Sequence, residues 1–132
     1  MNYEIEKTPA QWREELSPDR FAVLRKGATE APFTGSLLHV NDDGVFTCGG
    51  CGQHLFTSAQ KFDSSCGWPS FDACKPGTIV EQADRSLFRQ RTEILCSKCN
   101  SHLGHVFNDG PTSTGLRYCV NSLAIDFDET KN

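Results

Sequence analysis

The chain has 132 residues, 37% of them hydrophobic, which is enough for one packed domain spanning residues 1–132. Its formal net charge is −4 and it has no cluster of lysine and arginine, so nucleic acid is not expected as a partner. The acidic N-terminus carries no apolar signal segment and no apolar run approaches membrane-spanning length, so we expect a cytoplasmic protein without membrane contact. In the cytoplasm its seven cysteines should be reduced, metal-bound or catalytic.

Two short helices are predicted at the N-terminus. Thr8-Pro9 is typical of an N-cap followed by proline at the first helical position, and it opens a helix to about Leu16. Ser17-Pro18 repeats the signal, and this second helix should end at Gly27. The apolar side chains of the pair are expected to pack and not to bind a ligand: Trp12, Leu16, Phe21 and Leu24.

The rest of the chain is predicted to be irregular over residues 28–43 and then mostly β. Clusters of turn residues separate short runs of strand-forming residues, and no linker or low-complexity segment interrupts them. The predicted strands cover residues 45–48, 54–57, 78–81, 86–90, 92–96, 117–121 and 122–127.

Two C-x-x-C motifs, at residues 48–51 and 96–99, are each followed by a residue suited to a positive φ, Gly52 and Asn100. Disulfides or a redox C-x-x-C pair are the alternatives to a metal site, but both must explain a duplicated pattern in a chain with an odd number of cysteines. Four thiolates at this spacing predict one structural zinc ion bound by Cys48, Cys51, Cys96 and Cys99.

The segment from residue 61 to residue 72 is rich in turn formers, yet it carries a thiol, Cys66, and the large aromatic residues Trp68 and Phe71. In one interpretation the aromatic side chains fold back into the core and Cys66 is a small filler. In the other they form an apolar wall beside a mobile thiol. Composition alone slightly favours the core, because large aromatic side chains usually pack.

In an extended segment from Arg117 to Asn121, side chains alternate, so Arg117, Cys119 and Asn121 share one face. A nearby guanidinium lowers the pKa of a thiol, and the thiolate is the nucleophile. The alternative is a buried structural thiol, because the same parity aligns Cys119 with Ile125 and Phe127. A reactive Cys119 therefore requires a bulge near Asn121, or a strand that runs from a site into the core.

His102 and His105 are candidate acids because the ordinary histidine pKa is near neutral. On a regular strand they point to opposite faces, so they converge only if Gly104 makes a turn or a bulge. His102 also occupies the position that mirrors His54 of the first C-x-x-C motif, which is compatible with a structural role. Glu81 is interpreted as a solvated or capping carboxylate unless it faces a cleft.

Together these motifs closely resemble the methionine-R-sulfoxide reductases, the B-type family, over essentially the whole chain. The resemblance is carried by the two C-x-x-C motifs, Cys66-Gly-Trp-Pro-Ser-Phe71, His102-Leu-Gly-His-Val-Phe-Asn-Asp-Gly-Pro111 and Arg117-Tyr-Cys-Val-Asn121. It implies a mainly β fold of two small antiparallel sheets, with short N-terminal helices and a zinc ion held away from the active site.

The resemblance also implies roles for individual residues. Cys119 would be the nucleophile, Trp68 would pack against the substrate methyl group, and the sulfoxide oxygen or its waters would be surrounded by His102, His105 and Asn121. Phe107, Arg117 and Glu81 look like supporting residues. Cys66 matches the family's usual resolving cysteine, and Cys74 is the runner-up.

The implied reaction reduces methionine-R-sulfoxide, mainly in oxidised proteins, through a Cys119 sulfenic acid and a Cys66–Cys119 disulfide that thioredoxin recycles. A monomer is expected. One rival hypothesis is a non-enzymatic zinc module that binds a protein partner, which leaves Cys66, Trp68 and the histidines unexplained. Another is a zinc enzyme with His102 or His105 as a ligand, although four thiolates already complete a tetrahedron.

Overall fold

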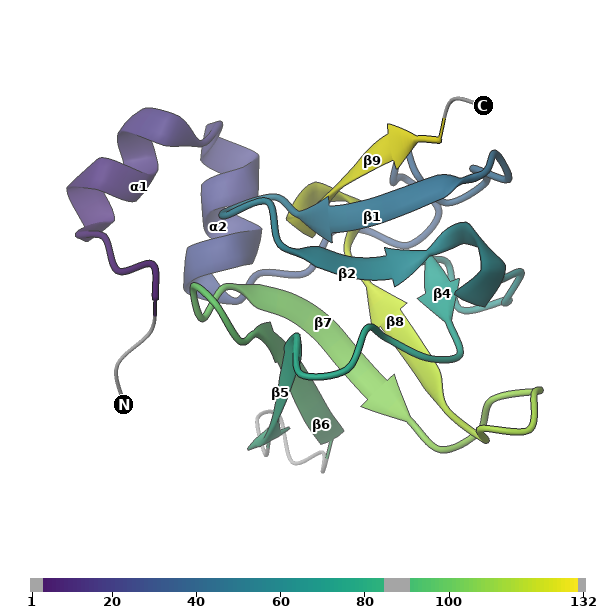
Figure 1. Ribbon diagram of the computed structural model, residues 1–132. Coiled ribbons are helices and arrows are strands. Elements are labelled where there is room, and N and C mark those ends of the chain that lie inside the picture. Colours follow the sequence, from purple (N-terminus) through teal and green to yellow (C-terminus); the bar gives the residue numbers. More distant parts are fainter. Residues whose placement is uncertain (1–3, 85–90, 131–132) are drawn as a thin grey trace.

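The computed structural model describes residues 4–84 and 91–130, and Figure 1 shows the N-terminal helices beside the β-sheets. The strand expected at residues 86–90 lies outside the described residues. The elements are α1 (Pro9–Glu15), α2 (Pro18–Lys26), β1 (Gly44–Cys48), β2 (His54–Thr57), η1 (Ser58–Gln60), β3 (Lys61–Phe62), β4 (Ser70–Phe71), β5 (Ile79–Asp84), β6 (Arg91–Cys96), β7 (His102–Phe107), β8 (Arg117–Val120), η3 (Ser122–Ala124) and β9 (Ile125–Glu129).

Both helices begin and end close to the predicted residues. Thr8 and Gln11 form the reciprocal hydrogen bonds of a capping box, and Gly27 ends α2 with a φ of 73°. Trp12 and Leu24 are each 1% exposed, which confirms that this pair packs on the core. Within the part of the chain that the structure describes, no helix is long and apolar enough to cross a membrane.

The strands form two sheets in which the paired strands are antiparallel. The smaller sheet has the order β2-β1-β9 and the larger has the order β3-β4-β8-β7-β6-β5. In Figure 1 the helices lie at one end of both sheets, beside the turns that lead from β1 to β2 and from β6 to β7. The predicted fold class, mainly β with short N-terminal helices, is confirmed.

Aromatic side chains from both sheets meet in the core. Phe56 of β2 stacks on Phe71 of β4 with ring centroids 4.2 Å apart, and Phe46 of β1 meets Phe71 edge-on at 4.9 Å. All three rings are at most 1% exposed. Phe71 is therefore a core residue, as the composition of its loop favoured.

Strand β8 carries the motif around Cys119 through the middle of the larger sheet, between β4 and β7. After Val120 the chain turns through η3 and enters β9 of the smaller sheet. This 3-10 turn breaks the strand alternation, so Cys119 can face a cleft while Ile125 is 1% exposed in the core. The break that a reactive Cys119 requires is present, as a turn and not as a bulge.

Candidate active site and metal centre

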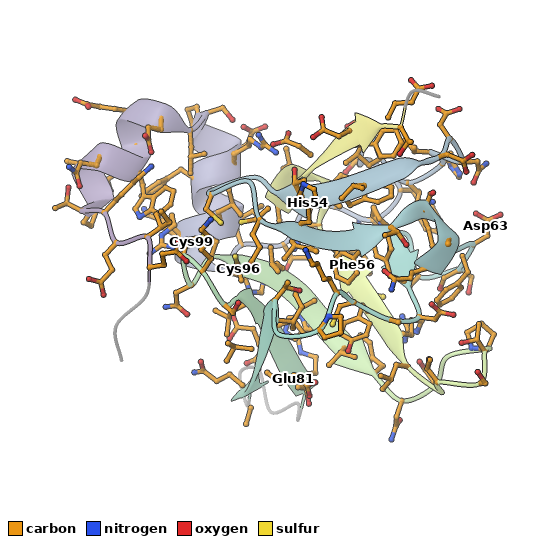
Figure 2. All side chains as sticks on the ribbon, in the orientation of Figure 1. His54, Phe56, Asp63, Glu81, Cys96 and Cys99 are labelled. Atoms are coloured by element: carbon orange, nitrogen blue, oxygen red, sulfur yellow. The ribbon has the colours of Figure 1, made fainter. Side chains whose placement is uncertain are left out.

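The two C-x-x-C motifs come together at the helical end of the molecule. The four sulfur atoms of Cys48, Cys51, Cys96 and Cys99 all lie within 4.8 Å of one another. Each motif turns through a left-handed residue, Gly52 with φ 82° and Asn100 with φ 63°, as predicted. Figure 2 shows Cys96 and Cys99 where the β6–β7 turn approaches the helices.

The spacing of the sulfur atoms fits a metal ion and not disulfides. Cys48 Sγ lies 3.7 Å from Cys99 Sγ, and Cys51 Sγ lies 3.6 Å from Cys96 Sγ. A disulfide needs about 2.05 Å. Four sulfurs at about 2.3 Å from a tetrahedral centre would be about 3.8 Å apart. The cluster is therefore built to hold a metal ion.

Neighbouring donors suit sulfur atoms in their thiolate form. The Gly50 N–H donates to Cys48 Sγ at 3.3 Å, and Gln53 Nε2 donates to Cys96 Sγ at 3.2 Å. Hydrogen bonds to the charged form of a group favour that form. Among the described residues the metal-binding group contains cysteines alone, so neither His102 nor His105 belongs to it.

A separate cleft of about 300 Å³ opens over β7 and β8, and none of the four clustered cysteines lines it. It brings together residues that are distant in the sequence: Thr29, Cys66, Trp68, Arg91, Gly104, His105, Phe107, Arg117, Cys119 and Asn121. Most of the predicted site residues therefore meet in one place. Their positions along the sequence do not by themselves indicate that the loop around Cys66 reaches β8.

Cys119 and Cys66 form a close thiol pair in this cleft. Their Sγ atoms are 3.1 Å apart, and Ser70 Oγ lies 3.3 Å from Cys66 Sγ. Arg117 Nη1 donates to Cys119 Sγ at 2.7 Å, which confirms that Arg117 and Cys119 share a face. Both cysteines are free thiols.

The hydrogen bond between the two sulfur atoms shifts their pKa values in opposite directions. The hydrogen bond with Cys119, opposed by burial, lowers the pKa of Cys66 to about 4. The same hydrogen bond, together with burial, raises the pKa of Cys119, while Arg117 and Ser70 act to lower it. At neutral pH the pair therefore carries one negative charge, held between two adjacent sulfur atoms and beside a guanidinium.

Arg117 is held in place on two further sides. Its Nε and Nη2 atoms donate to the two carboxylate oxygens of Asp109 at 2.7 and 3.0 Å. The guanidinium carbon also lies 4.5 Å from the ring centroid of Phe107, within range of a cation–π contact. This arrangement fixes the orientation of Nη1, the nitrogen that donates to Cys119.

A bulge in β7 brings the two histidines together. Leu95 pairs with His102 while Ile94 pairs with Gly104, so β7 has one extra residue, Leu103, at this point. As a result the rings of His102 and His105 lie 5.7 Å apart, centroid to centroid. The bulge that their convergence requires is confirmed.

The two histidines have different environments. His102 Nδ1 lies 2.6 Å from Glu93 Oε2, and His105 Nε2 lies 2.8 Å from Asp84 Oδ2. Burial lowers the pKa of His105, opposed by its hydrogen bond with Asp84, so the environment favours the neutral ring. His102 is 5% exposed, and its buried Nε2 has no hydrogen-bond partner within residues 4–84 and 91–130.

Trp68 lines the cleft and is half-buried, so the preference for the core that its loop composition suggested is wrong for this residue. Its indole Nε1 donates to the backbone oxygen of Glu30 at 3.0 Å. Asn121 Oδ1 accepts from the Glu30 N–H at 3.0 Å, and Asn121 Nδ2 donates to Leu103 O at 3.1 Å. The irregular segment before β1 thus contacts two residues of the cleft.

Glu30 is the functional candidate that the sequence analysis missed. Its side chain is buried, at 8% exposed, and Oε1 accepts from the Leu123 N–H at 2.9 Å. A Cβ atom at Gly35 would lie 2.4 Å from Glu30 Oε2, so the neighbouring chain packs closely around the carboxylate. An acidic residue in an irregular segment has no periodicity that could have marked it as buried.

Comparison with known proteins shows the family of the chain. The SelR domain family model matches residues 16–129. The chain belongs to the SelR domain family. A peptide methionine sulfoxide reductase MsrB of Leptospira interrogans is 51% identical over 128 residues, covering 96% of this chain and 98% of the relative. A protein of the same name from Bradyrhizobium diazoefficiens is 54% identical and covers 90% and 86% of the two chains.

A more distant solved structure shares the fold alone. The crystal structure of the Mis18 'Yippee-like' domain superposes with a TM-score of 0.56 at 19% identity, covering 68% of this chain and 99% of that one. It supports the SelR-family architecture of sheets and helices, and it carries no argument about function.

Three residues that the sequence analysis named do not line the cleft: His102, whose ring lies next to that of His105, Glu81 and Cys74. Glu81 is exposed on β5 and lines a separate hollow; Figure 2 shows it at the lower edge of the molecule. The Cys74 thiol donates to the Tyr118 hydroxyl at 3.8 Å. Within this member of the SelR family, therefore, Cys66 is the thiol in contact with Cys119.

Proposed function

We propose that this protein reduces methionine-R-sulfoxide in oxidised proteins to methionine, with Cys119 as the nucleophile. The observation that carries the proposal is the pair of thiols 3.1 Å apart, with Arg117 donating to Cys119, inside a cleft. Relatives that are about half identical over nearly the whole chain are named peptide methionine sulfoxide reductase MsrB, which supports the same reaction.

In the first step the Cys119 thiolate attacks the sulfoxide sulfur, and the oxygen takes a proton. The protonated oxygen then passes from the substrate sulfur to Cys119 Sγ as the S–O bond of the substrate and the temporary bond between the two sulfurs break. Methionine leaves and Cys119 becomes a sulfenic acid, so the substrate sulfur is reduced and the enzyme sulfur is oxidised. Arg117 supports this step because a guanidinium hydrogen-bonded to Cys119 favours its thiolate.

His102 is our candidate for the proton donor. Its Nδ1 lies 2.6 Å from Glu93 Oε2, which fixes the orientation of the ring, and its Nε2 is buried without a partner in the described chain. His105 and Asn121 border the cleft and would contact the sulfoxide oxygen or its waters. Glu81 does not line the cleft, so the position of its side chain does not support the predicted supporting role.

Trp68 and Phe107 are our candidates for binding the methionine side chain. Both line the cleft, and each is held in place: Trp68 by its hydrogen bond to Glu30, and Phe107 by the guanidinium of Arg117. An apolar wall of two aromatic rings suits the methyl group and the side-chain carbons of the substrate.

Cys66 then resolves the sulfenic acid. Its thiolate attacks Cys119 Sγ, the S–O bond of the sulfenic acid breaks, the departing hydroxyl takes a proton and leaves as water, and a Cys66–Cys119 disulfide forms, which thioredoxin returns to two thiols. The contact between the two sulfur atoms favours Cys66 over Cys74 for this step.

The expected cytoplasmic location would supply the reduced thioredoxin that this step needs. The monomeric state stays a prediction.

The metal in the four-cysteine cluster is proposed to be zinc. Four cysteine ligands with tetrahedral spacing form a closed site, which is typical of structural zinc. The ion would tie the β1–β2 turn to the β6–β7 turn, and the reaction uses none of these cysteines. A non-enzymatic zinc module remains the weaker hypothesis, because it gives no role to the paired thiols of the cleft.

The test is an assay on peptides that carry the R or the S epimer of methionine sulfoxide, with thioredoxin as reductant. We expect consumption of the R epimer alone, and loss of that activity in Cys119→Ser with the metal retained. If the metal-loaded protein consumed neither epimer, the zinc module would become the better hypothesis.

A further inference from the structure

Cys66 borders two different cavities. One is the cleft that it shares with Cys119. The other is a hollow of about 430 Å³, which we call the Asp63 hollow; Cys66 and Arg117 line both. The remaining residues of the Asp63 hollow are Phe62, Asp63, Ser64, Ser65, Asp109 and Pro111. In Figure 2 Asp63 projects from the edge of the molecule opposite Cys96 and Cys99.

The two cavities differ in chemical character. The cleft presents the aromatic rings of Trp68 and Phe107, whereas the Asp63 hollow presents two serines and two carboxylates. Asp63 and Ser65 are exposed, and Asp109 is bound to Arg117. The cleft thus suits an apolar side chain, and the hollow suits a polar or mildly basic surface.

The oxidised enzyme needs an approach path for an incoming thiolate. Thiol–disulfide exchange proceeds by attack of a thiolate on one sulfur and departure of the other, with the two outer sulfurs in line on either side of the central one. Cys119 is only 8% exposed and lies against Cys66, Arg117 and Ser70. Cys66 also opens on a second cavity, so it offers a reductant an approach outside the substrate cleft.

We propose that a dithiol protein of the thioredoxin kind docks over the Asp63 hollow and attacks Cys66, so that reductant and substrate use different entrances. This inference rests on the proposed function. The reductant thiolate forms a mixed disulfide with Cys66, the Cys66–Cys119 bond breaks, and Cys119 leaves as a thiolate. A second reductant thiol then displaces Cys66, and the reductant ends as a disulfide.

Arg117 favours this direction of cleavage. In the disulfide neither sulfur donates a hydrogen bond to the other, so the contact that raises the pKa of Cys119 in the reduced pair is absent, and the sulfur whose negative charge is better stabilised leaves faster. The guanidinium that lies 2.7 Å from Cys119 Sγ stabilises the negative charge that Cys119 acquires as it leaves. Attack on Cys119 would instead require the reductant to enter the cleft beside Trp68. The site of attack therefore returns Cys119 directly to its reactive form.

The first test traps the mixed disulfide. The enzyme is oxidised by methionine-R-sulfoxide until the Cys66–Cys119 disulfide is seen by mass spectrometry, and is then mixed with a thioredoxin whose second active-site cysteine is serine. We expect thioredoxin to be joined to Cys66 by a mixed disulfide, and the released Cys119 thiol to react with an alkylating reagent. Attachment to Cys119 would overturn the proposal.

This design separates the inference from the proposed function. If the sulfoxide produces no disulfide, the proposed function fails before any reductant is added. The disulfide can then be made with the thiol oxidant diamide, and the same trapping experiment still shows which sulfur the reductant attacks.

The second test fills the hollow with a large side chain at an exposed position. For Ser65→Trp we expect at least a tenfold loss of kcat/KM for thioredoxin. Turnover with dithiothreitol, and a single reduction of substrate by the pre-reduced enzyme, should stay within about twofold of wild type. Asn41→Trp, at an exposed turn that lines neither cavity, is the control. Equal thioredoxin kinetics in both variants, or an equal loss with dithiothreitol, would overturn the docking site.

Discussion

Arg117 Nη1 donates to Cys119 Sγ at 2.7 Å, while the other two guanidinium nitrogens donate to the two carboxylate oxygens of Asp109. The planar fork of arginine makes this double contact possible, and a lysine ammonium cannot reproduce it. The sulfur that we propose as the nucleophile is therefore paired with a cation whose position is fixed independently of the substrate.

Replacing this cation should slow the chemical step. We expect Arg117→Lys to lower the rate of a single reduction by about 10- to 100-fold, because a hydrogen bond to a charged group contributes about 1.5–3 kcal/mol. Rapid-quench measurement on the pre-reduced enzyme reports that rate directly. Arg13→Lys, on the exposed side of α1, is the matched control. Equal rates in the two variants would remove Arg117 from the mechanism.

The thiol pair predicts a specific pH dependence. A thiol whose pKa is lowered is ionised above that pKa, so above about pH 4 the resting pair should carry its charge on Cys66, and Cys119 becomes the thiolate when its proton moves to Cys66. In Cys119→Ala the donating thiol is lost, and the Cys66 pKa should rise towards the ordinary value of about 8.5. The pH dependence of the Cys66 ¹³Cβ chemical shift measures the Cys66 pKa in the wild type and in Cys119→Ala. Cys74→Ala should titrate like wild type; an unchanged Cys66 titration in Cys119→Ala would show that the two thiols are not coupled.

Glu30 should affect both stability and substrate binding. Glu30→Ala leaves the Leu123 N–H without its acceptor, and we expect the free energy of unfolding to fall by about 1–3 kcal/mol. Without its side-chain bond to Leu123, the Glu30 backbone should shift, and because that backbone bonds to Trp68 and Asn121, KM for the sulfoxide peptide should rise more than kcat falls.

The Trp68 indole N–H signal in NMR spectra distinguishes positioning from a general loss of stability. It should shift in Glu30→Ala and stay in place in Glu14→Ala, a change of an exposed glutamate in α1. A fully folded Glu30→Ala protein with the wild-type indole signal and KM would limit Glu30 to a structural role.

The metal cluster should stabilise the fold without taking part in the reaction. Cys96→Ser is expected to lose the metal and about 3 kcal/mol or more of stability, because the site forms only in the folded state, and Tm should fall by about 10 °C. Metal analysis and thermal unfolding test this, with Cys74→Ser as the control that keeps its metal. An apo variant with the wild-type Tm would contradict the structural role.

Local chemistry explains what could be predicted from the sequence. Capping residues such as Thr8 and Gly27 determine the helix ends, and residues that tolerate a positive φ determine the two C-x-x-C turns. The alternation of β8 predicted that Arg117 faces Cys119. Each of these features depends on a few neighbouring residues.

Features that depend on long-range packing could not be predicted in this way. Composition could not separate Trp68, which lines the cleft, from Phe71, which is fully buried, because the two differ only in what the fold places beside them. Glu30 is buried by contacts with residues more than 90 positions away. For Cys119, strand alternation alone could not show whether the side chain faces the core or the cleft, because the η3 turn after β8 breaks that alternation.

The most direct test of the central claim is a single-turnover experiment with Cys66→Ser. The pre-reduced variant is mixed with an excess of peptide methionine-R-sulfoxide, without thioredoxin, and both products are quantified. We predict one methionine per protein molecule and a sulfenic acid on Cys119, identified by dimedone labelling and mass spectrometry. A sulfenic acid on another cysteine, or no methionine at all from folded protein, would contradict the assignment of Cys119 as the nucleophile.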